Sequence, residues 1–262
     1  MRATEYIKHL LSLESYSFSL EEINRHTQSE NTALKLELAR LVKKKEIVSL
    51  RKGFYLILPP RYSQQGSLPI QLYIDKLFNS LNRNYYVGFY SAARFHGAAH
   101  QQTQREYVMI ETPKLRDIKK GVIDIRFVTT SEWPAGNIVE KKSDAGTFSV
   151  SGPLLTITDL IHHQNKLGGI NRMLATIEEL SEEITETELI NLLKWYPHKS
   201  TLQRLGFILE EVRPELKLSP LSDHLNTNPF FPVLLSAKGN QKPGSTGNKW
   251  KVDVNIKLEN DL

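Results

Sequence analysis

Residues 47–57 read Ile47-Val48-Ser49-Leu50-Arg51-Lys52-Gly53-Phe54-Tyr55-Leu56-Ile57. Two short runs rich in β-branched and aromatic residues flank a cationic turn, and this pattern predicts a β-hairpin. Gly53 suits the turn because a tight hairpin needs a residue that tolerates positive φ. The predicted hairpin therefore presents the positive charges of Arg51 and Lys52 at its tip.

The residues before the hairpin predict three helices. The first covers residues 4–13, and Ser19 begins the second, because Glu22 can reach back to the Ser19 backbone N–H in a capping box. The third helix carries an apolar stripe at helical spacing, made of Leu34, Leu38, Leu41 and Val42. Three helices followed by a basic hairpin, the wing, predict a winged helix-turn-helix over residues 1–62.

In this fold, double-stranded DNA is the expected partner. The third helix meets base edges in the major groove with its N-terminal half, and the wing lies over the phosphate backbone. The candidate contacts are Gln28, Ser29, Asn31, Thr32 and Lys35 at the start of the helix, Lys43 and Lys44 at its end, and Arg51 and Lys52 in the wing. Two other roles stay open: Asn31 is equally suited to cap the helix, and the lysines suit the helix dipole.

Charge and composition agree with this class of protein. The 262-residue chain has a net charge of +5, and residues 40–61 hold seven cations against one acid, Glu46. Such a local excess attracts the nucleic-acid backbone. The sequence lacks a long apolar run, an apolar N-terminal signal and cysteine, so we expect a cytoplasmic protein with no membrane contact, no disulfide and no thiolate metal site.

The remainder of the chain predicts a second, mixed domain. The prolines at 59 and 60 and the polar residues after them predict a linker at residues 63–67, followed by a domain over residues 68–262. A first helix is expected over 68–81 and strands over 106–110, 123–128 and 147–151, with a basic loop between the first two strands. The whole chain is therefore an α+β protein, with a small sheet and a helical half in its second domain.

The helical half is predicted from three capping boxes. These pair Thr156 with Asp159, Thr185 with Glu188, and Ser200 with Gln203. After them, residues 250–258 alternate apolar and polar side chains and predict a half-buried strand. An acidic stretch free of Lys and Arg, residues 178–188, is either a solvated surface or a docking face for a basic protein.

The catalytic patterns in the chain are weak. His96 and His100 are four residues apart, but Gly97 interrupts the helix that would align them as metal ligands. The pattern of acidic residues and lysine in metal-dependent nucleases is matched by Asp124 with the segment Glu140-Lys141-Lys142. A nucleotidyltransferase signature is matched in part by Gly244-Ser245 with Asp253, but Asn255 replaces the second acidic residue that would hold the metal ions. We therefore expect no enzyme, no cofactor and no metal.

Several segments together resemble the AbiEi antitoxin family of type IV toxin–antitoxin systems, also called abortive-infection regulators. The segments are Arg51-Lys-Gly-Phe-Tyr55, Tyr86-Val-Gly-Phe-Tyr-Ser-Ala-Ala-Arg-Phe-His-Gly97, Pro153-Leu-Leu-Thr-Ile-Thr-Asp-Leu160 with Gly168-Gly169, Leu202-Gln-Arg-Leu-Gly-Phe-Ile-Leu209 and Lys249-Trp-Lys-Val-Asp-Val-Asn255. Their order and spacing cover nearly the whole chain.

The resemblance implies a winged helix-turn-helix that binds inverted repeats in its own promoter, and a C-terminal domain that counters a nucleotidyltransferase-like toxin, directly or indirectly. Promoter repeats favour cooperative occupancy by two or more copies, and the family role is defence against viruses by abortive infection. The family pattern is also matched by Ser91, His96, Arg204 and Gly206. Each of these residues could equally serve to build the fold. For Arg204 we expect an ion pair with a carboxylate on a helix.

Two alternatives remain from the sequence. The first is a stand-alone winged-helix regulator whose C-terminal domain senses a ligand or serves assembly. The second is a metal-dependent nuclease or nucleotidyltransferase guided by the winged helix.

Overall fold

The computed structural model describes residues 2–27, 31–98, 104–237 and 241–259. The chain divides into two compact units. The first unit contains residues 1–86, 104–131 and 140–149, and the second contains residues 87–103, 132–139 and 150–262. This division interleaves segments of the chain, so the predicted boundary at residues 63–67 stays a prediction.

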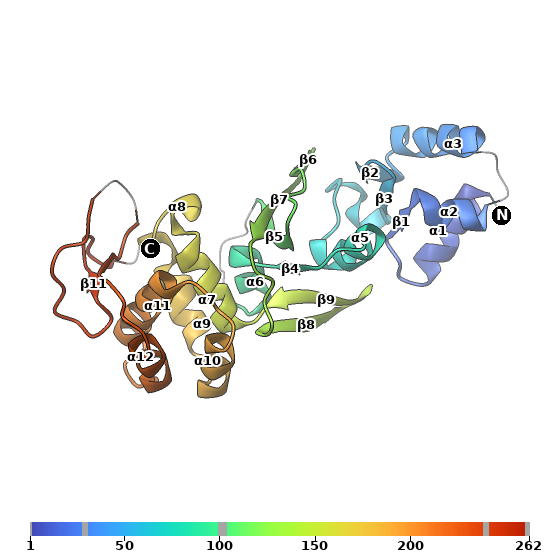
Figure 1. The fold of residues 1–262 in the computed structure, drawn as a ribbon. Coiled ribbons are helices and arrows are strands. Elements are labelled where there is room, and N and C mark those ends of the chain that lie inside the picture. The colour runs from blue at the N-terminus through green and yellow to red at the C-terminus, as the bar shows by residue number, and fades with distance from the viewer. Residues whose placement is uncertain (1, 28–30, 99–103, 238–240, 260–262) are drawn as a thin grey trace. The chain divides into compact units, whose positions relative to one another are not determined.

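The first unit begins with three helices and a three-stranded sheet. Its elements are α1 (Ala3–Ser12), β1 (Ser17–Ser19), α2 (Leu20–His26), α3 (Asn31–Lys43), β2 (Ile47–Arg51) and β3 (Phe54–Ile57). The strand order is β1-β3-β2 with antiparallel pairing, and Figure 1 shows these elements in blue. The predicted hairpin is confirmed, whereas β1 is a strand that the sequence pattern does not predict.

Helices α2 and α3 form where the capping box and the apolar stripe predict them. Ser19 and Glu22 make the predicted capping box, with the Glu22 N–H donating to the Ser19 Oγ at 3.0 Å. Leu34, Leu38 and Leu41 are buried, in a core that also contains Phe18. The predicted stripe thus packs α3 against the sheet and the first two helices, which leaves the opposite side of α3 exposed.

The remainder of the first unit is built around a larger sheet. It contains α4 (Pro60–Ser63), the 3₁₀ turn η1 (Ile70–Leu72), α5 (Ile74–Leu81), β4 (Tyr85–Val87), β5 (Glu106–Glu111), β6 (Ile118–Lys120), β7 (Ile123–Thr130), β8 (Ile138–Ser143) and β9 (Gly146–Ser151). The strand order is β6-β7-β5-β4-β9-β8, and β4, β8 and β9 each have residues in both units.

Two predictions for this region need correction. The single helix over 68–81 is divided at Tyr73, whose φ of −146° is not helical, into η1 and α5. The basic loop after β5 contains the strand β6, which pairs antiparallel with β7 through Lys120 opposite Ile123. The predicted strands over 106–110, 123–128 and 147–151 are confirmed as β5, β7 and β9.

The second unit is mainly helical. It contains α6 (Phe89–Phe95), α7 (Pro153–His162), α8 (Gln164–Leu167), η2 (Asn171–Met173), α9 (Leu174–Ser181), α10 (Glu186–Leu193), α11 (Lys199–Val212), α12 (Ser219–Asn226) and the two-residue strands β10 (Val233–Leu234) and β11 (Val252–Asp253). Helix α7 is its centre: residues 153–161 are all buried, and α6, α9, α10 and α11 contact it (Figure 1).

The capping predictions in this unit have mixed outcomes. The box of Thr185 and Glu188 is confirmed at the start of α10. Helix α7 instead begins after Gly152, so Thr156 lies within the helix and its Oγ1 donates to the Gly152 carbonyl at 2.9 Å. Helix α11 begins after His198, which leaves Ser200 inside it. Pro153 at the first position of α7 was the better start signal, since it lacks the N–H that a helix leaves unpaired there.

The C-terminal strand is much shorter than predicted. Only Val252 and Asp253 pair, in parallel, with Val233 and Leu234. Trp250 is fully buried although it lies outside the strand, and Lys251 has a φ of +52°, which interrupts an extended run there. The alternation of apolar and polar side chains over residues 250–258 therefore reflects partial burial of an irregular segment and not a continuous strand. Within the described residues, no helix has both the length and the hydrophobicity that crossing a membrane requires.

Candidate nucleic-acid interface

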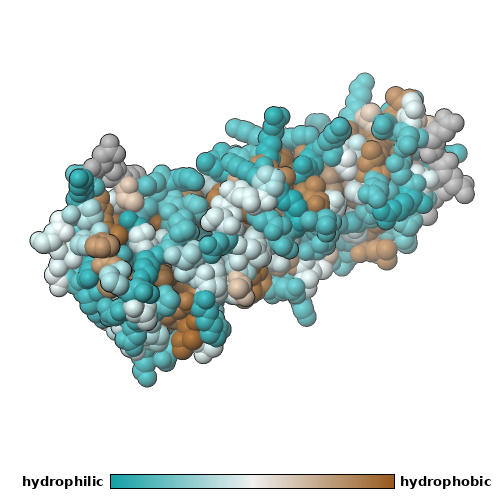
Figure 2. Space-filling model, in the orientation of Figure 1, coloured by the Kyte–Doolittle hydropathy of each residue, from teal (hydrophilic) through white to brown (hydrophobic). Residues whose placement is uncertain are grey.

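The exposed side of α3 carries the residues that the sequence places at base edges. Asn31, Thr32 and Lys35 occupy its first turns and are all exposed. Leu36 lies beside them with 57% of its surface accessible, and Figure 2 shows hydrophobic surface among hydrophilic residues over this helix. Gln28 and Ser29, the other two predicted contacts at this end, lie outside the described residues.

The C-terminal end of α3 presents a second group of cations. Lys43 ends the helix and Lys44 follows it, and both are exposed. The Lys44 Nζ lies 4.0 Å from the Glu46 carboxylate, at a site where both side chains are largely solvated. Such a pair contributes little to stability, so these lysines remain available to an external anion.

The turn between β2 and β3 holds Arg51 and Lys52. Lys52 is exposed and Arg51 is half-buried. Gly53 has a φ of +79°, as predicted, and its carbonyl accepts a hydrogen bond of 2.7 Å from the Leu20 N–H at the start of α2. This bond fixes the turn to α2, so its two cations have a defined place beside the N-terminal helices.

A further cationic strand lies beside the hairpin. The Lys120 Nζ of β6 donates to the Ser49 carbonyl of β2, and Lys119 is exposed next to it. The sequence pattern places both residues in a loop of the second domain, away from the predicted wing. Gly121, with a φ of +56° before the apolar residue Ile123, was the signal for a tight turn that could have indicated the β6–β7 hairpin.

The acidic residues that imitate nuclease and nucleotidyltransferase patterns have structural partners. Asp124 Oδ2 accepts hydrogen bonds from Arg105 Nε at 3.0 Å and Nη2 at 2.9 Å. Asp253 Oδ2 accepts the Gly244 N–H at 2.7 Å. Asn255 bonds both backbone groups of Ser236. These side chains stabilise the local fold, and among the described residues no group of histidines and carboxylates is arranged to hold a metal ion.

The His96 side chain is only 3% exposed and lies in the second unit, while His100 lies outside the described residues. The His96 Nε2 lies 2.8 Å from the Ser151 carbonyl, and its Nδ1 lies 3.6 Å from Glu183. Glu183 belongs to the acidic stretch, in which Glu188 also caps α10. At least these two carboxylates therefore act within the fold, and the stretch is only partly a free acidic surface.

Two residues of the family pattern have clear packing roles. The Arg204 Nε donates to the Leu234 carbonyl at 2.8 Å, and its Nη1 lies 3.4 Å from the Ser200 carbonyl. The expected carboxylate partner is thus wrong, because the side chain bonds backbone carbonyls of β10 and of its own helix. Gly206 lies against Trp250, where a Cβ would come within 2.4 Å of the indole. Ser91 is fully buried.

Comparison with known proteins identifies the family of the central part of the chain. Residues 86–211 match the AbiEi antitoxin C-terminal domain. The matched residues begin within β4 and end within α11, and the match confirms the resemblance to the AbiEi antitoxin family noted in the sequence. An antitoxin family implies a toxin as partner.

One solved structure supports the mixed α+β fold. The crystal structure of the RV2827C protein from Mycobacterium tuberculosis matches with a TM-score of 0.65 and 13% sequence identity, over 95% of this chain and 90% of that chain. An antigenic nucleotidyltransferase-like protein from Paracoccidioides brasiliensis gives a TM-score of 0.38 and 10% identity, over 58% of this chain and 88% of that chain, a value too low to indicate a shared fold. No curated protein matches the sequence.

Proposed function

We propose that this protein is the antitoxin of a type IV toxin–antitoxin system and represses its own operon by binding promoter DNA. The antitoxin role rests on the match of residues 86–211 to the AbiEi antitoxin C-terminal domain. The expected toxin is a nucleotidyltransferase-like enzyme, countered directly or indirectly, and the antitoxin itself has no catalytic role. The expected setting is the cytoplasm of a cell defended against viruses.

The DNA-binding role rests on the exposed side of α3 and the cationic turn beside it. In the proposal, residues 1–62 are a winged helix-turn-helix, residues 63–67 a linker and residues 68–262 the antitoxin domain. Helix α3 enters the major groove with Asn31, Thr32 and Lys35, together with Gln28 and Ser29 before them. Lys43, Lys44, Arg51 and Lys52 contact phosphates, and inverted repeats in the promoter favour cooperative binding of two or more copies.

The experiment that tests the antitoxin role is rescue of growth. Cells would express the toxin reading frame beside the gene alone, with the full-length protein, and with the full-length Arg51→Ala, Lys52→Ala variant. We expect both forms to restore growth, because the exchanged residues lie in the proposed DNA-binding part. Toxicity that neither form relieves would contradict the antitoxin role.

The repressor role has its own readout in the same cells. A reporter fused to the operon promoter should be repressed by the wild-type protein and released by the Arg51→Ala, Lys52→Ala variant, since DNA binding weakens when cations no longer neutralise phosphates. A matched control is Lys242→Ala, which removes an exposed cation from the C-terminal loop. Equal repression by all three forms would place the DNA interface elsewhere.

A further inference from the structure

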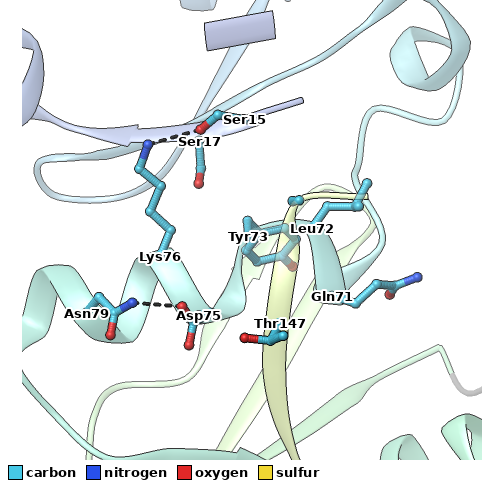
Figure 3. A pocket seen from close by; sticks show the side chains of 10 residues that line it. Ser15, Ser17, Gln71, Leu72, Tyr73, Asp75, Lys76, Asn79 and Thr147 are labelled. Carbon is cyan, nitrogen blue, oxygen red and sulfur yellow. Dashed lines mark hydrogen bonds between the residues drawn. The ribbon is translucent and has the colours of Figure 1, made fainter. Parts of the chain in front are cut away.

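A small polar pocket lies in the first unit, apart from the exposed side of α3. Its volume is about 200 Å³, and its walls come from β1, η1, α5 and the start of β9 (Figure 3). Since one water occupies roughly 30 Å³ of liquid volume, this space suits a molecule of about five to eight non-hydrogen atoms. The lining is mostly polar, which excludes an apolar ligand.

Two polar atoms in this lining have no protein partner. Ser17 is 1% exposed, yet its Oγ makes no hydrogen bond, and Figure 3 shows this hydroxyl between Lys76 and Tyr73. The Oε1 of Gln71 is likewise buried and unpaired. A buried hydroxyl without a partner destabilises the fold, so it indicates a group that is paired when the pocket is filled.

One end of the pocket offers hydrogen-bond donors. The Lys76 Nζ donates to the Ser15 Oγ at 3.1 Å and to the Glu22 carboxylate at 2.8 Å. An ammonium group has three donors, so one remains for a ligand. The Ser17 hydroxyl lies nearby and can donate as well. Together they suit a carboxylate, which accepts several hydrogen bonds at once.

The other end offers a carboxylate. Asp75 accepts hydrogen bonds from Asn79 Nδ2 at 2.7 Å and from the Tyr85 hydroxyl at 3.1 Å, both of them neutral donors. Within the described residues, no cation pairs with Asp75 in the way that Lys76 pairs with Glu22. Each carboxylate oxygen keeps a free lone pair, so Asp75 suits a ligand ammonium group. A water molecule is neutral and therefore cannot provide a positive partner for the Asp75 carboxylate.

We propose that the pocket binds a small free amino acid, with its carboxylate at Lys76 and Ser17 and its ammonium group at Asp75. Glycine, alanine, serine and threonine fit the available volume, and the polar walls favour a hydroxyl-bearing side chain. The proposal concerns binding by the full-length protein and does not depend on whether the protein binds DNA or counters a toxin.

Isothermal titration calorimetry with L-serine, L-threonine, L-alanine and glycine tests the proposal on the full-length protein. N-Acetyl-L-serine lacks the ammonium charge, and L-serinamide lacks the carboxylate. We expect at least one amino acid to bind with a Kd below about 1 mM, and both derivatives to bind at least about tenfold more weakly. No binding by any amino acid at about 10 mM, or equal binding of serine and its derivatives, would overturn the proposal and leave a pocket filled by water.

Two variants connect the binding to these residues. Ser17→Ala should weaken the Kd about tenfold while leaving the stability of the free protein unchanged or higher, because it removes an unpaired buried hydroxyl. Asp75→Asn should remove the preference for serine over N-acetylserine. The controls are Ser80→Ala, on α5 but outside this pocket, and Asp117→Asn, on the surface. Wild-type affinity in Ser17→Ala, with the protein folded, would place the ligand elsewhere.

Discussion

Gly206 and Trp250 fit together so closely that any side chain at position 206 would displace the indole. A Cβ on Gly206 would lie 2.4 Å from the Trp250 Cε3, closer than atoms in contact can come. The indole N–H donates to Glu210 on the same helix at 2.6 Å, and the Trp250 carbonyl accepts from the Gln203 side chain at 2.9 Å. Helix α11 thus contacts the C-terminal segment through Gln203, Gly206 and Glu210, which lie along one face of the helix.

The first prediction follows from this fit. Gly206→Ala should lower the free energy of unfolding by about 1–3 kcal/mol, because the indole must move out of its site. The change opposes helix propensity, which favours alanine over glycine by about 1 kcal/mol in a helix interior. Urea denaturation measures it, with Gly247→Ala as control, since a Cβ at Gly247 meets no atom within 4 Å. A variant as stable as wild type would show that Trp250 can shift without cost.

The second prediction concerns the cationic turn. Arg51→Ala with Lys52→Ala should weaken binding to promoter and random DNA alike, because interactions with phosphates carry no sequence information. The slope of log K against log salt should fall by about one unit for each phosphate that the variant no longer neutralises. Fluorescence anisotropy over a salt series measures the slope. An unchanged slope would remove this turn from the DNA interface.

The third prediction separates base reading from capping at Asn31. If Asn31 reads a base, Asn31→Ala should relax the preference at one operator position by about 1–3 kcal/mol and leave binding to random DNA unchanged. Competition binding with operators substituted at single positions measures this preference. An equal decrease in affinity for operator and random DNA, together with a lower free energy of unfolding, would instead assign Asn31 to stabilising the start of α3.

The fourth prediction concerns pH and His163. Burial lowers the pKa of this half-buried imidazole from 6.5 to about 3, assisted by the neighbouring His162, Lys166 and His198. The folded protein therefore holds His163 neutral between pH 3 and 6.5, while the unfolded chain binds a proton there. The free energy of unfolding should fall as the pH falls below 6.5, and it should be independent of this group above that value.

Denaturant titrations at about pH 7.5, 5.5 and 4.5, on a protein buffered at about 0.15 M ionic strength, measure this decline. His163→Gln should make the decline shallower, because the unfolded variant has one proton site fewer. His9→Gln is the control, since His9 is exposed on α1. The same decline in wild type and His163→Gln would assign the pH dependence to other groups.

Elements with strong local signals were predictable from the sequence. The hairpin with Gly53, the capping boxes at Ser19 and Thr185, and the apolar stripe of α3 each depend on residues within a few positions of one another. Strand β6 was missed although its partner β7 follows at once, because the basic residues before Gly121 were interpreted as a loop. The division of the 68–81 helix at Tyr73 was missed because the apolar residues continue on both sides of it. The role of Asp124 could not be predicted, because it depends on Arg105, which lies beside it only in the folded chain.

The sequence by itself determined the three helices and the hairpin of the first sixty residues, the cations on their surface, and the resemblance to the AbiEi antitoxin family, since these follow from local patterns and from the spacing of short motifs. Only the tertiary structure decided which polar residues have hydrogen-bond partners within the fold. It paired Asp253 with Gly244 and Arg204 with Leu234, and it left the buried Ser17 hydroxyl unpaired beside Lys76. Hydrogen bonding and burial depend on distances between segments far apart in the chain, which no local pattern contains.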